Sequence, residues 1–448
     1  LGEDGVILKV MKRPTPKTSF MGEEFFSIQG IEGFVDSALS ELASEFEVSS
    51  IGFSTVGESV VPVRNGKALS DAPLWNAYSV TSTDEERKVI EALAPASRIG
   101  TAQNPLFSVH KILWMKRNMA ECNDADFYLP LSSYLCYRKT GSAAWDYSQA
   151  ARSGMFDIRT KEWIRELSAA FSIRLPEDIL PMGSAMGECD GTVYGLGGHD
   201  HIAGFYGIER ILASEGKQVY YSSMGTSEVL AAIVPESSVK EISPSRKSYI
   251  SPSFRPSSFI ATRSFRSFGA LLREVMAITG YDDYEKMNHD IEALERKSAA
   301  CIFAQDGDFI GHDLLPGKLY ISELDSNASG SELAQAAYLY LSAVSRIMRD
   351  DLERSYGLDP DYVFASGGAI TGNSLFMRYL ASALNHPVTL LETEEISALG
   401  AALIGLSAYS VEELQRISRL SGRRQIMPDD SLTDLIDDAI GRYRAAKR

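Results

Sequence analysis

The sequence has little cysteine and no long apolar run. Its four cysteines, Cys122, Cys136, Cys189 and Cys301, form no C-x-x-C pair and show no spacing typical of metal ligands. We therefore expect free thiols in a reducing compartment, which favours the cytoplasm. No stretch approaches the roughly 20 apolar residues of a membrane span, and no signal peptide opens the chain, so no membrane partner is expected.

Positive charge is also scarce. Lysine and arginine number 44 against 60 aspartate and glutamate residues, which gives a net charge of −16. That sign opposes non-specific binding to nucleic acid or anionic lipid, so no nucleic-acid partner is expected. A phosphate ligand would have to be held by backbone amides, a bound cation or a few placed side chains, not by a broad positive field.

The length predicts more than one domain. A chain of 448 residues exceeds what one hydrophobic core usually supports, so we expect two domains with a cleft between them. A helical apolar period predicts a helix over residues 31–46, and strands joined to an Asn-Gly turn are expected over 48–69. A pair of strands is expected over residues 219–234, and a strand, a glycine-rich turn and a helix over 361–384. Helices should dominate residues 104–180, and the domain boundary should fall near a helix over 204–214.

The first ten residues, LGEDGVILKV, lack methionine and contain an Asp-Gly pair. Asp-Gly is typical of hairpin turns, and the VILKV that follows is rich in residues that favour strands. The sequence therefore predicts a strand over residues 6–10, whose hairpin partner would lie before Leu1.

Three turns share one physical property. They are GGHDH (197–201), SSMGTSE (222–228) and ASGGAITGN (365–373). Glycine permits positive φ and close approach of the backbone, so the N–H groups of such turns can face an anionic ligand. One turn of this kind is weak evidence for a binding site, because most glycine-rich turns are structural. Three in this order are stronger evidence.

The first turn places Asp200 between His199 and His201. A carboxylate where a strand leads into a helix can act as a catalytic base, bind a metal ion or cap the helix. Aspartate is favoured as a helix cap, and from the residues alone the cap and the base are equally supported.

Three longer segments carry a resemblance to a known family. They are IGFSTVGESVVPVRNGKALSDAPLWNAY (51–78), SVHKILWMKRN (108–118) and WDYSQAARSGMFDIRTKEW (145–163). With the three glycine turns, and in the same order and spacing, they resemble the FGGY family of carbohydrate kinases, which transfer the γ-phosphoryl group of ATP to a sugar hydroxyl. The likeness covers almost the whole chain, and its specific part includes the signature around Lys111, Trp114 and Asn118.

The resemblance implies an α/β, two-domain fold of the actin-like ATPase (ribonuclease H-like) type. Residues 1–208 would form a sugar-binding domain and residues 209–448 a nucleotide-binding domain. ATP and Mg²⁺ would be the cofactors and a small sugar or polyol the substrate, with assembly as a homodimer left open. The family's metal-binding aspartate belongs to a first strand that would lie before Leu1.

The resemblance also implies roles for single residues. Asp200 would be the general base, and partial burial should raise its pKa. The sugar would contact Glu58, Trp75, Asn76, His199 and His201; the phosphates would contact Gly225 and Thr226; and adenosine would contact Gly367, Gly368 and Asn373. Each role has a structural alternative: a core position for Trp75, structural histidines, and turns that only connect two elements.

Two departures from the family pattern leave a second function open. The loop after Trp75 reads WNAYS and lacks the aspartate and arginine that the family usually offers to sugar hydroxyls. The family's second signature is matched poorly over residues 325–341. The alternative is therefore a non-catalytic sugar-sensing or interaction protein that retains the kinase fold.

Overall fold

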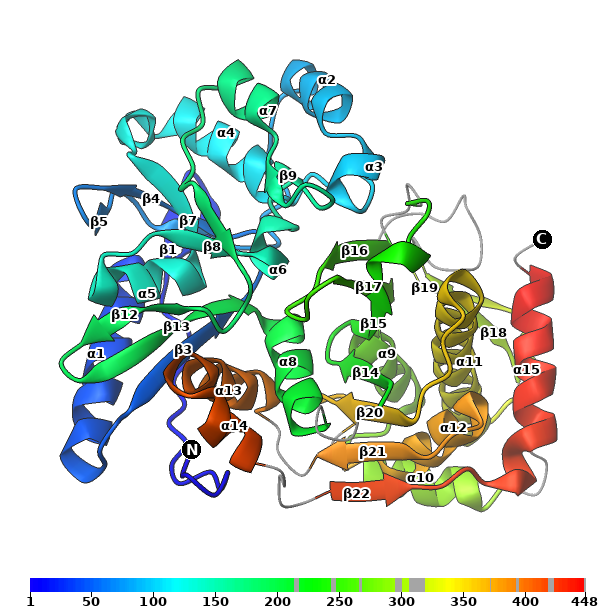
Figure 1. The fold of residues 1–448 in the computed structure, drawn as a ribbon. Helices are drawn as coiled ribbons and strands as arrows, with labels where there is room; N and C mark the ends of the chain where they lie inside the picture. The colour runs from blue at the N-terminus through cyan, green and yellow to red at the C-terminus, as the bar shows by residue number, and fades with distance from the viewer. Residues whose placement is uncertain are drawn as a thin grey trace. The chain divides into compact units, whose positions relative to one another are not determined.

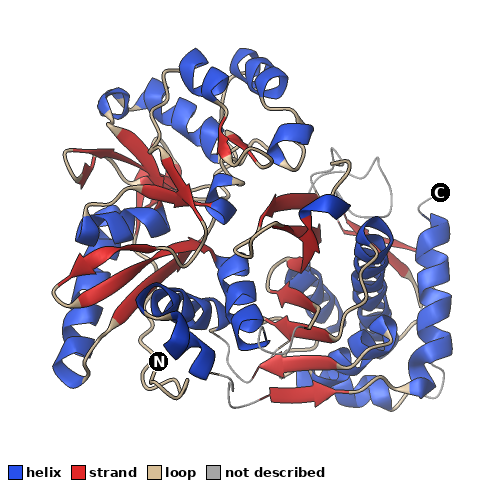
Figure 2. Ribbon diagram, viewed as in Figure 1, coloured by secondary structure: helices blue, strands red, loops and turns tan. Residues whose placement is uncertain are grey.

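The structure is a computed structural model with a mixed α/β fold (Figures 1 and 2). It describes residues 1–212, 217–242, 247–265, 268–294, 300–305, 319–370, 372–391, 395–417 and 423–446. The chain divides into two compact units. The first unit comprises Leu1–Gly216, Ile233–Ile260 and Ser397–Ser421, and the second comprises Lys217–Ala232, Ala261–Ile396 and Gly422–Arg448.

Neither unit is continuous in sequence, because the chain returns to the first unit for residues 233–260 and 397–421. The division of the family domains between residues 208 and 209, and the cleft between the domains, stay predictions. Each unit has its own sheets and helices, and each is described by itself.

The strands of the first unit form small sheets, of which three have three strands each among the described residues. Their orders are β1-β2-β6, β5-β4-β7 and β12-β13-β3. The bounds are β1 Lys17–Phe20, β2 Glu23–Phe26, β3 Ser50–Thr55, β4 Val60–Arg64, β5 Lys67–Ala68, β6 Ala72–Pro73, β7 Phe127–Pro130, β12 Ala185–Cys189 and β13 Thr192–His199. Two further pairs are β8 Ala144–Asp146 with β11 Asp178–Leu180, and β9 Phe156–Asp157 with β10 Glu162–Trp163.

Helices cover these small sheets (Figure 2). Their bounds are α1 Ile28–Glu45, α2 Asp84–Leu93, α3 Ala96–Ile99, α4 Ser108–Asn118, α5 Leu131–Thr140, α6 Tyr147–Ala150, α7 Arg165–Ala170, α8 Asp200–Leu212, α13 Ile396–Tyr409 and α14 Val411–Arg416. The helix predicted over residues 31–46 is confirmed as α1. The Asn-Gly turn is confirmed between β4 and β5, where Asn65 and Gly66 both have positive φ.

The strand predicted over residues 6–10 is wrong, because this segment has no regular secondary structure. Gly5 does form a turn with φ of 81°, and the Gly2 N–H donates to the Val6 carbonyl. The apolar side chains that follow, including Leu8 and Val10, are exposed. A strand needs a paired neighbour to satisfy its backbone groups, and the described chain does not bring one to this segment.

Helix α13 packs closely on the elements that carry the first glycine turn (Figure 1). A Cβ on Gly52 of β3 would lie 2.1 Å from the Ala401 carbonyl oxygen, and a Cβ on Gly400 would lie 1.9 Å from the Ala203 carbonyl oxygen of α8. Such distances leave no space for a side chain. Glycine on both sides therefore allows backbone-to-backbone packing of α13 against β3 and α8.

A seven-stranded sheet has the order β16-β17-β15-β14-β20-β21-β22. Its strands are β14 Val219–Met224, β15 Glu228–Pro235, β16 Ser248–Pro252, β17 Ser258–Phe265, β20 Tyr362–Ser366, β21 Val388–Leu391 and β22 Arg423–Ile426. Strands β14, β20, β21 and β22 lie wholly in the second unit. A smaller pair joins β18 Ile302–Gln305 to β19 Leu319–Ser322.

Helix α11, Gly330–Tyr356, lies at the centre of the second unit's helices and packs against α9, α10, α12 and α15. These are α9 Phe268–Thr279, α10 Tyr284–Glu292, α12 Ser374–Leu384 and α15 Thr433–Ala446. Every residue of α11 from Ala334 to Ser345 is buried. The sequence predictions of a strand pair around residues 219–234 and of a strand, turn and helix over 361–384 are confirmed.

Cys122, Cys136, Cys189 and Cys301 are all free thiols, and all but Cys189 are buried. Among the helices that the structure describes, none is both long enough and apolar enough to cross a membrane.

The packing of α13 predicts the effect of one added methyl group. Gly400→Ala should lower the free energy of unfolding by at least about 1–3 kcal/mol, because its Cβ meets backbone oxygen that cannot rotate away. Gly33→Ala is the matched control, since Gly33 lies in α1 with no atom within 4 Å of where the added methyl group would stand, and it should stabilise by about 0.5–1 kcal/mol. Urea unfolding of both variants checks this; equal stability would contradict the close packing.

Candidate active site

The first glycine turn lies where β13 ends and α8 begins, so that Asp200 is the first residue of the helix. Strand β13 runs parallel to β3, with His199 opposite Thr55. A Cβ on Gly197 would lie 1.8 Å from the Phe53 carbonyl oxygen, and a Cβ on Gly198 would lie 2.1 Å from Met182 Cε. Glycine is therefore required at position 197, where the neighbour is backbone, and this close approach fixes where the next residues emerge, whereas the methionine tip beside Gly198 is flexible.

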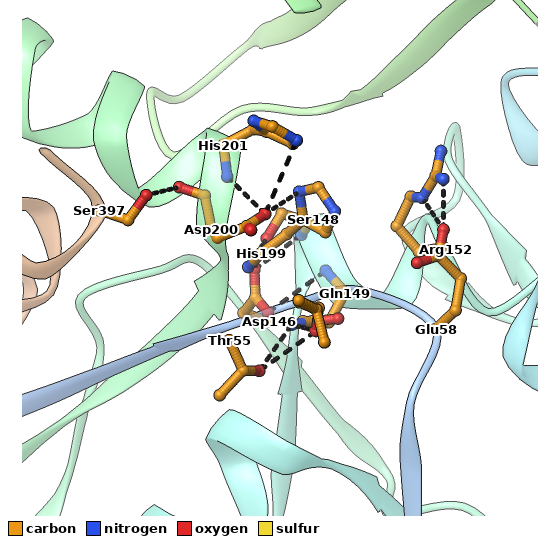
Figure 3. Close-up of polar contacts among 11 residues, drawn as sticks. Thr55, Glu58, Asp146, Ser148, Gln149, Arg152, His199, Asp200, His201 and Ser397 are labelled. Atoms are coloured by element: carbon orange, nitrogen blue, oxygen red, sulfur yellow. Dashed lines mark hydrogen bonds and ion pairs between the residues drawn. The ribbon is translucent and has the colours of Figure 1, made fainter. Parts of the chain in front are cut away.

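A buried hydrogen-bond network holds the backbone just before Asp200 (Figure 3). Asp146 is fully buried and caps α6 by accepting bonds from the Ser148 and Gln149 N–H groups. The Ser148 hydroxyl donates to Asp146 and in turn accepts a 3.0 Å bond from the His199 N–H. The hydroxyl thus links the α6 cap to the turn that carries Asp200.

The Asp200 carboxylate is one-third exposed and lies beside two imidazoles. Its Oδ1 accepts a 2.8 Å bond from the His201 N–H and lies 3.6 Å from His199 Nδ1. Its backbone carbonyl accepts a 3.1 Å bond from the Ser397 hydroxyl of α13. A capping side chain accepts bonds from the second or third residue of a helix, so the bond to His201, the next residue, is not that of an ordinary cap.

The pKa of Asp200 lies below its ordinary value. Burial alone would raise this pKa, but His201, His199, the His201 N–H and Arg152 favour the charged form and outweigh burial. The raised pKa expected from the sequence is therefore wrong. The carboxylate is ionised at neutral pH and can accept a proton.

His199 and His201 face each other across Asp200, with ring centroids 5.3 Å apart. Burial lowers the pKa of His199 to about 4, so this imidazole is neutral at pH 7. The ring packs against the Gly57 backbone: a Cβ on Gly57 would lie 2.5 Å from His199 Cδ2. A neutral imidazole held in this way can donate a hydrogen bond to a hydroxyl or accept one from it, and it adds no charge to the site.

Glu58 follows directly in the same turn and pairs with Arg152 of the segment after α6. Arg152 Nε donates a 2.6 Å bond to Glu58 Oε1. The guanidinium also stacks on Tyr249, whose ring centroid lies 4.4 Å away. Glu58 therefore follows the Gly57 backbone that packs on His199, and the structure adds Arg152 and Tyr249 to its surroundings.

Trp75 and Asn76 lie on the surface, and Trp75 is 44% exposed. The structural alternative of a core position for Trp75 is therefore wrong. Below them, the fully buried Lys111 donates bonds of 3.0 and 2.8 Å to the carbonyls of Trp75 and Leu106. Burial lowers the pKa of Lys111 to about 8. This signature lysine holds the tryptophan loop in place.

The other two glycine turns lie side by side in the second unit. Strands β14 and β20 are parallel and in register from Val219 to Ser223, so the turns that follow them emerge at the same edge of the sheet. Gly367 has φ of 127°, and a Cβ there would lie 2.2 Å from the Met224 carbonyl oxygen. Gly225 and Gly368 have open space at their Cβ positions, and Thr226 and Gly368 are exposed.

Asn373 differs from these neighbours because it is only 1% exposed. Its Oδ1 caps α12 by accepting a bond from the Phe376 N–H, and the Tyr338 hydroxyl lies 2.9 Å from the same oxygen. Its Nδ2 makes no hydrogen bond among the described residues. The structure therefore assigns Asn373 a capping role at the end of the glycine turn, and a contact with a nucleotide stays a prediction.

Sequence reasoning missed Asp146, Ser148, Arg152 and Tyr249. The first three lie in the segment 145–163 that carries the family resemblance, so a search for charged and hydroxyl side chains in that segment would have found them. Tyr249 has no such signal, because only the fold brings β16 to Arg152. In the part of the chain that the structure describes, no group of three or more His, Cys, Asp or Glu residues could hold a metal ion.

The chain matches two domains of one protein family. Residues 27–194 match the N-terminal domain of the FGGY family of carbohydrate kinases, and residues 309–409 match the C-terminal domain of the same family. The two matches lie in the order expected from the sequence motifs.

Individual proteins show the same likeness. Glycerol kinase of Thermococcus onnurineus is 26% identical over 412 residues, covering 84% of this chain and 78% of the relative. Xylulose kinase of Haemophilus influenzae is 25% identical over 401 residues, covering 82% and 77%. Among solved structures, xylulose kinase from Lactobacillus acidophilus has a TM-score of 0.81 at 15% identity, covering 99% of this chain and 93% of that one.

The Asp146 network predicts a pH dependence of stability. Burial raises the pKa of Asp146 to about 7 from its ordinary 3.8. The folded protein therefore keeps this proton up to about pH 7, whereas the unfolded chain releases it near pH 4, so the free energy of unfolding falls as pH rises between these values. Asp146→Asn keeps the cap and removes the titration.

The free energy of unfolding of Asp146→Asn, minus that of the parent, should accordingly increase from pH 4 to pH 7 by an amount on the order of 4 kcal/mol. Urea unfolding of both proteins at several pH values measures this difference. A difference that stays constant with pH would show that Asp146 does not bind a proton on folding.

Proposed function

The chain belongs to the FGGY family of carbohydrate kinases, and from its site we propose that Asp200 is the general base of phosphoryl transfer. The fold is that of the two-domain actin-like ATPases, and the activity is ATP-dependent phosphorylation of a carbohydrate. The observation that supports the role of Asp200 is its position: a partly exposed, ionised carboxylate at the start of α8, where hydrogen bonds hold the backbone on both sides.

The proposed reaction needs little covalent chemistry from the protein. A substrate hydroxyl attacks the γ-phosphorus of ATP, the bond from that phosphorus to the ADP oxygen breaks, and Asp200 accepts the hydroxyl proton. Positioning and stabilisation of charge supply most of the rate enhancement in such reactions. A low pKa suits Asp200 to this role, because the base must be unprotonated when the hydroxyl binds.

On the substrate side, the proposal assigns a small sugar or polyol to the first unit. Glu58 and His199 offer polar groups next to Asp200, and His201 lies on its other side. Trp75 and Asn76 are exposed on the loop that Lys111 holds, where an aromatic face suits the apolar side of a sugar ring.

On the nucleotide side, the proposal assigns the phosphates to Gly225 and Thr226 and the adenosine to Gly367 and Gly368. These residues lie at the carboxyl ends of two parallel strands, where ligands bind in α/β sheets. Asn373 would act by shaping the turn and capping α12. A helix cap buried this deeply supports the turn's conformation whether or not it touches the nucleotide.

Mg²⁺ would accompany ATP as the proposed counter-ion of its phosphates. The described residues hold no ready cluster of metal ligands, and Mg²⁺ usually keeps several waters and phosphate oxygens as ligands. The cytoplasm is the proposed compartment, because a kinase needs ATP and the described cysteines are free thiols.

No described feature favours the non-catalytic alternative. A sensor would need neither an ionised carboxylate beside the substrate groups nor a hydroxyl-bearing turn at the sheet edge, and both are present. The eroded second signature, residues 325–341, includes the start of the buried helix α11, so its divergence affects packing more directly than the candidate site.

Asp200→Asn should lower kcat by about 10²–10⁴, because the variant cannot accept the proton in the transition state. ATP affinity should stay within about twofold. Steady-state ADP release in the presence of substrate measures the first quantity, and calorimetric titration with ATP measures the second.

Asp178→Asn is a matched control for this test, since Asp178 is an exposed aspartate of β11. Its turnover should equal that of the parent. If Asp200→Asn also turned over at the parent's rate, Asp200 would have no part in proton transfer.

Thr226→Ala should raise the KM for ATP by about 10–100-fold, the effect of one hydrogen bond to a charged phosphate. Thr226→Ser retains the hydroxyl and should stay close to the parent. The comparison uses ADP release at saturating substrate. An unchanged KM in Thr226→Ala would leave this turn with a purely structural role.

A further inference from the structure

We propose that the Glu58–Arg152 pair makes this kinase select neutral sugars or polyols over sugar acids. In this proposal Glu58 accepts a hydrogen bond from a substrate hydroxyl, and Arg152 is the positioning residue that fixes Glu58. The inference rests on the proposed function of the site, and it adds the class of substrate.

Glu58 has an unusual backbone conformation for a side chain of its size. Its φ is 62°, a left-handed value that costs non-glycine residues free energy, and its side chain is only 3% exposed. The Ser108 hydroxyl donates a 3.1 Å bond to its carbonyl, and Gln149 Nε2 donates a 3.2 Å bond to the Val56 carbonyl in the same turn. The turn is thus held from two helices, which directs the Glu58 carboxylate toward Arg152.

The pairing uses only one oxygen of that carboxylate (Figure 3). The hydrogen bond from Arg152 Nε and the closest contact of its Nη2 both fall on Oε1. Among the described residues, no hydrogen bond is made to Oε2. A carboxylate this deeply buried normally has both oxygens satisfied, so Oε2 is suited to accept a hydroxyl from a ligand.

Arg152 lies over two aromatic rings in addition to its ion pair. Its guanidinium carbon lies 4.4 Å from the ring centroid of Tyr249 and 5.3 Å from that of Phe107. Contact with two aromatic rings suits the planar guanidinium and would not suit a lysine ammonium in the same way. The positive charge is already balanced by Glu58 and is not an open site for a carboxylate.

The charges around the Glu58–Arg152 pair also favour a neutral substrate over an acidic one. Gly57, the residue before Glu58, packs against His199, which is neutral at pH 7, and Asp200 beyond it is ionised. Lys111 also interacts electrostatically with this pair. It is fully buried, and its ammonium donates hydrogen bonds to two backbone carbonyls. A carboxylate on the substrate would therefore add negative charge beside Asp200 and Glu58, where these described cations are already engaged.

The test compares neutral and acidic substrates of equal carbon number, a polyol or aldose against the corresponding aldonate. The proteins are the parent, Arg152→Met, Arg152→Lys and Glu58→Gln. Arg98→Met is the matched control, because Arg98 makes a 2.8 Å ion pair with the largely buried Asp157 and lies outside the proposed site. The readouts are kcat and KM from ADP release, and substrate binding by calorimetry without ATP.

The parent should show a kcat/KM at least about tenfold higher for the neutral compound. Arg152→Met should raise the KM for that compound about tenfold or more while kcat falls less than about threefold, and Arg152→Lys should lie between the two. Glu58→Gln should reduce the preference for the neutral compound, because it removes the negative charge. Arg98→Met should leave KM and the preference unchanged.

Two results would overturn the proposal: a parent that prefers the acid, or an Arg152→Met variant with the parent's KM and preference. Absence of substrate-dependent ADP release in the parent would instead contradict the proposed kinase function. In that case calorimetry still tests the inference. Neutral compounds should bind the parent and bind Arg152→Met more weakly. The inference would be refuted if acids bound the parent as tightly as neutral compounds, or if neither bound.

Discussion

The position of Asp200 depends on one steric constraint, the close approach of β13 to β3. There is no room for a side chain at Gly197, because the Phe53 carbonyl oxygen lies 1.8 Å from where a Cβ would stand. The Ser148 hydroxyl then binds the next N–H, and the helix begins one residue later. A carboxylate held in this way needs no rearrangement before it accepts a proton, which is the main contribution that a protein can make to phosphoryl transfer.

Three buried carboxyl groups of the described residues, Glu228, Asp146 and Glu58, have different hydrogen-bond partners. Glu228 accepts bonds from the Ser222 and Ser345 hydroxyls, and burial raises its pKa to about 7. Asp146 is likewise bonded to neutral donors. Glu58 is instead paired with a stacked guanidinium on one oxygen only. In Glu228 and Asp146 these bonds satisfy a carboxyl within the core, whereas the contacts of Arg152 fall on one oxygen of Glu58 and leave the other able to accept a hydrogen bond from a ligand.

Much of the fold could be predicted from the sequence, because periodicity and turn residues act locally. The Asn65-Gly66 turn, helix α1 and the strand-turn-helix around Gly367 are examples. The segment 6–10 failed because a strand also needs a partner, which local sequence does not reveal. At the site, the turn residues were predicted from the family resemblance, but the pKa of Asp200 was not, since its sign depends on the balance of burial against His199, His201 and Arg152. Tyr249 could not be predicted because its contact with Arg152 exists only in the fold.

The most direct test of Asp200 as the general base is chemical rescue of Asp200→Ala with added formate. The account predicts that the variant releases no substrate-dependent ADP alone, and that formate restores release in a saturable manner by supplying a carboxylate in the space of the missing side chain. Substrate-dependent ADP release by Asp200→Ala at the parent's rate without formate would contradict the account, because the reaction would then proceed without this base.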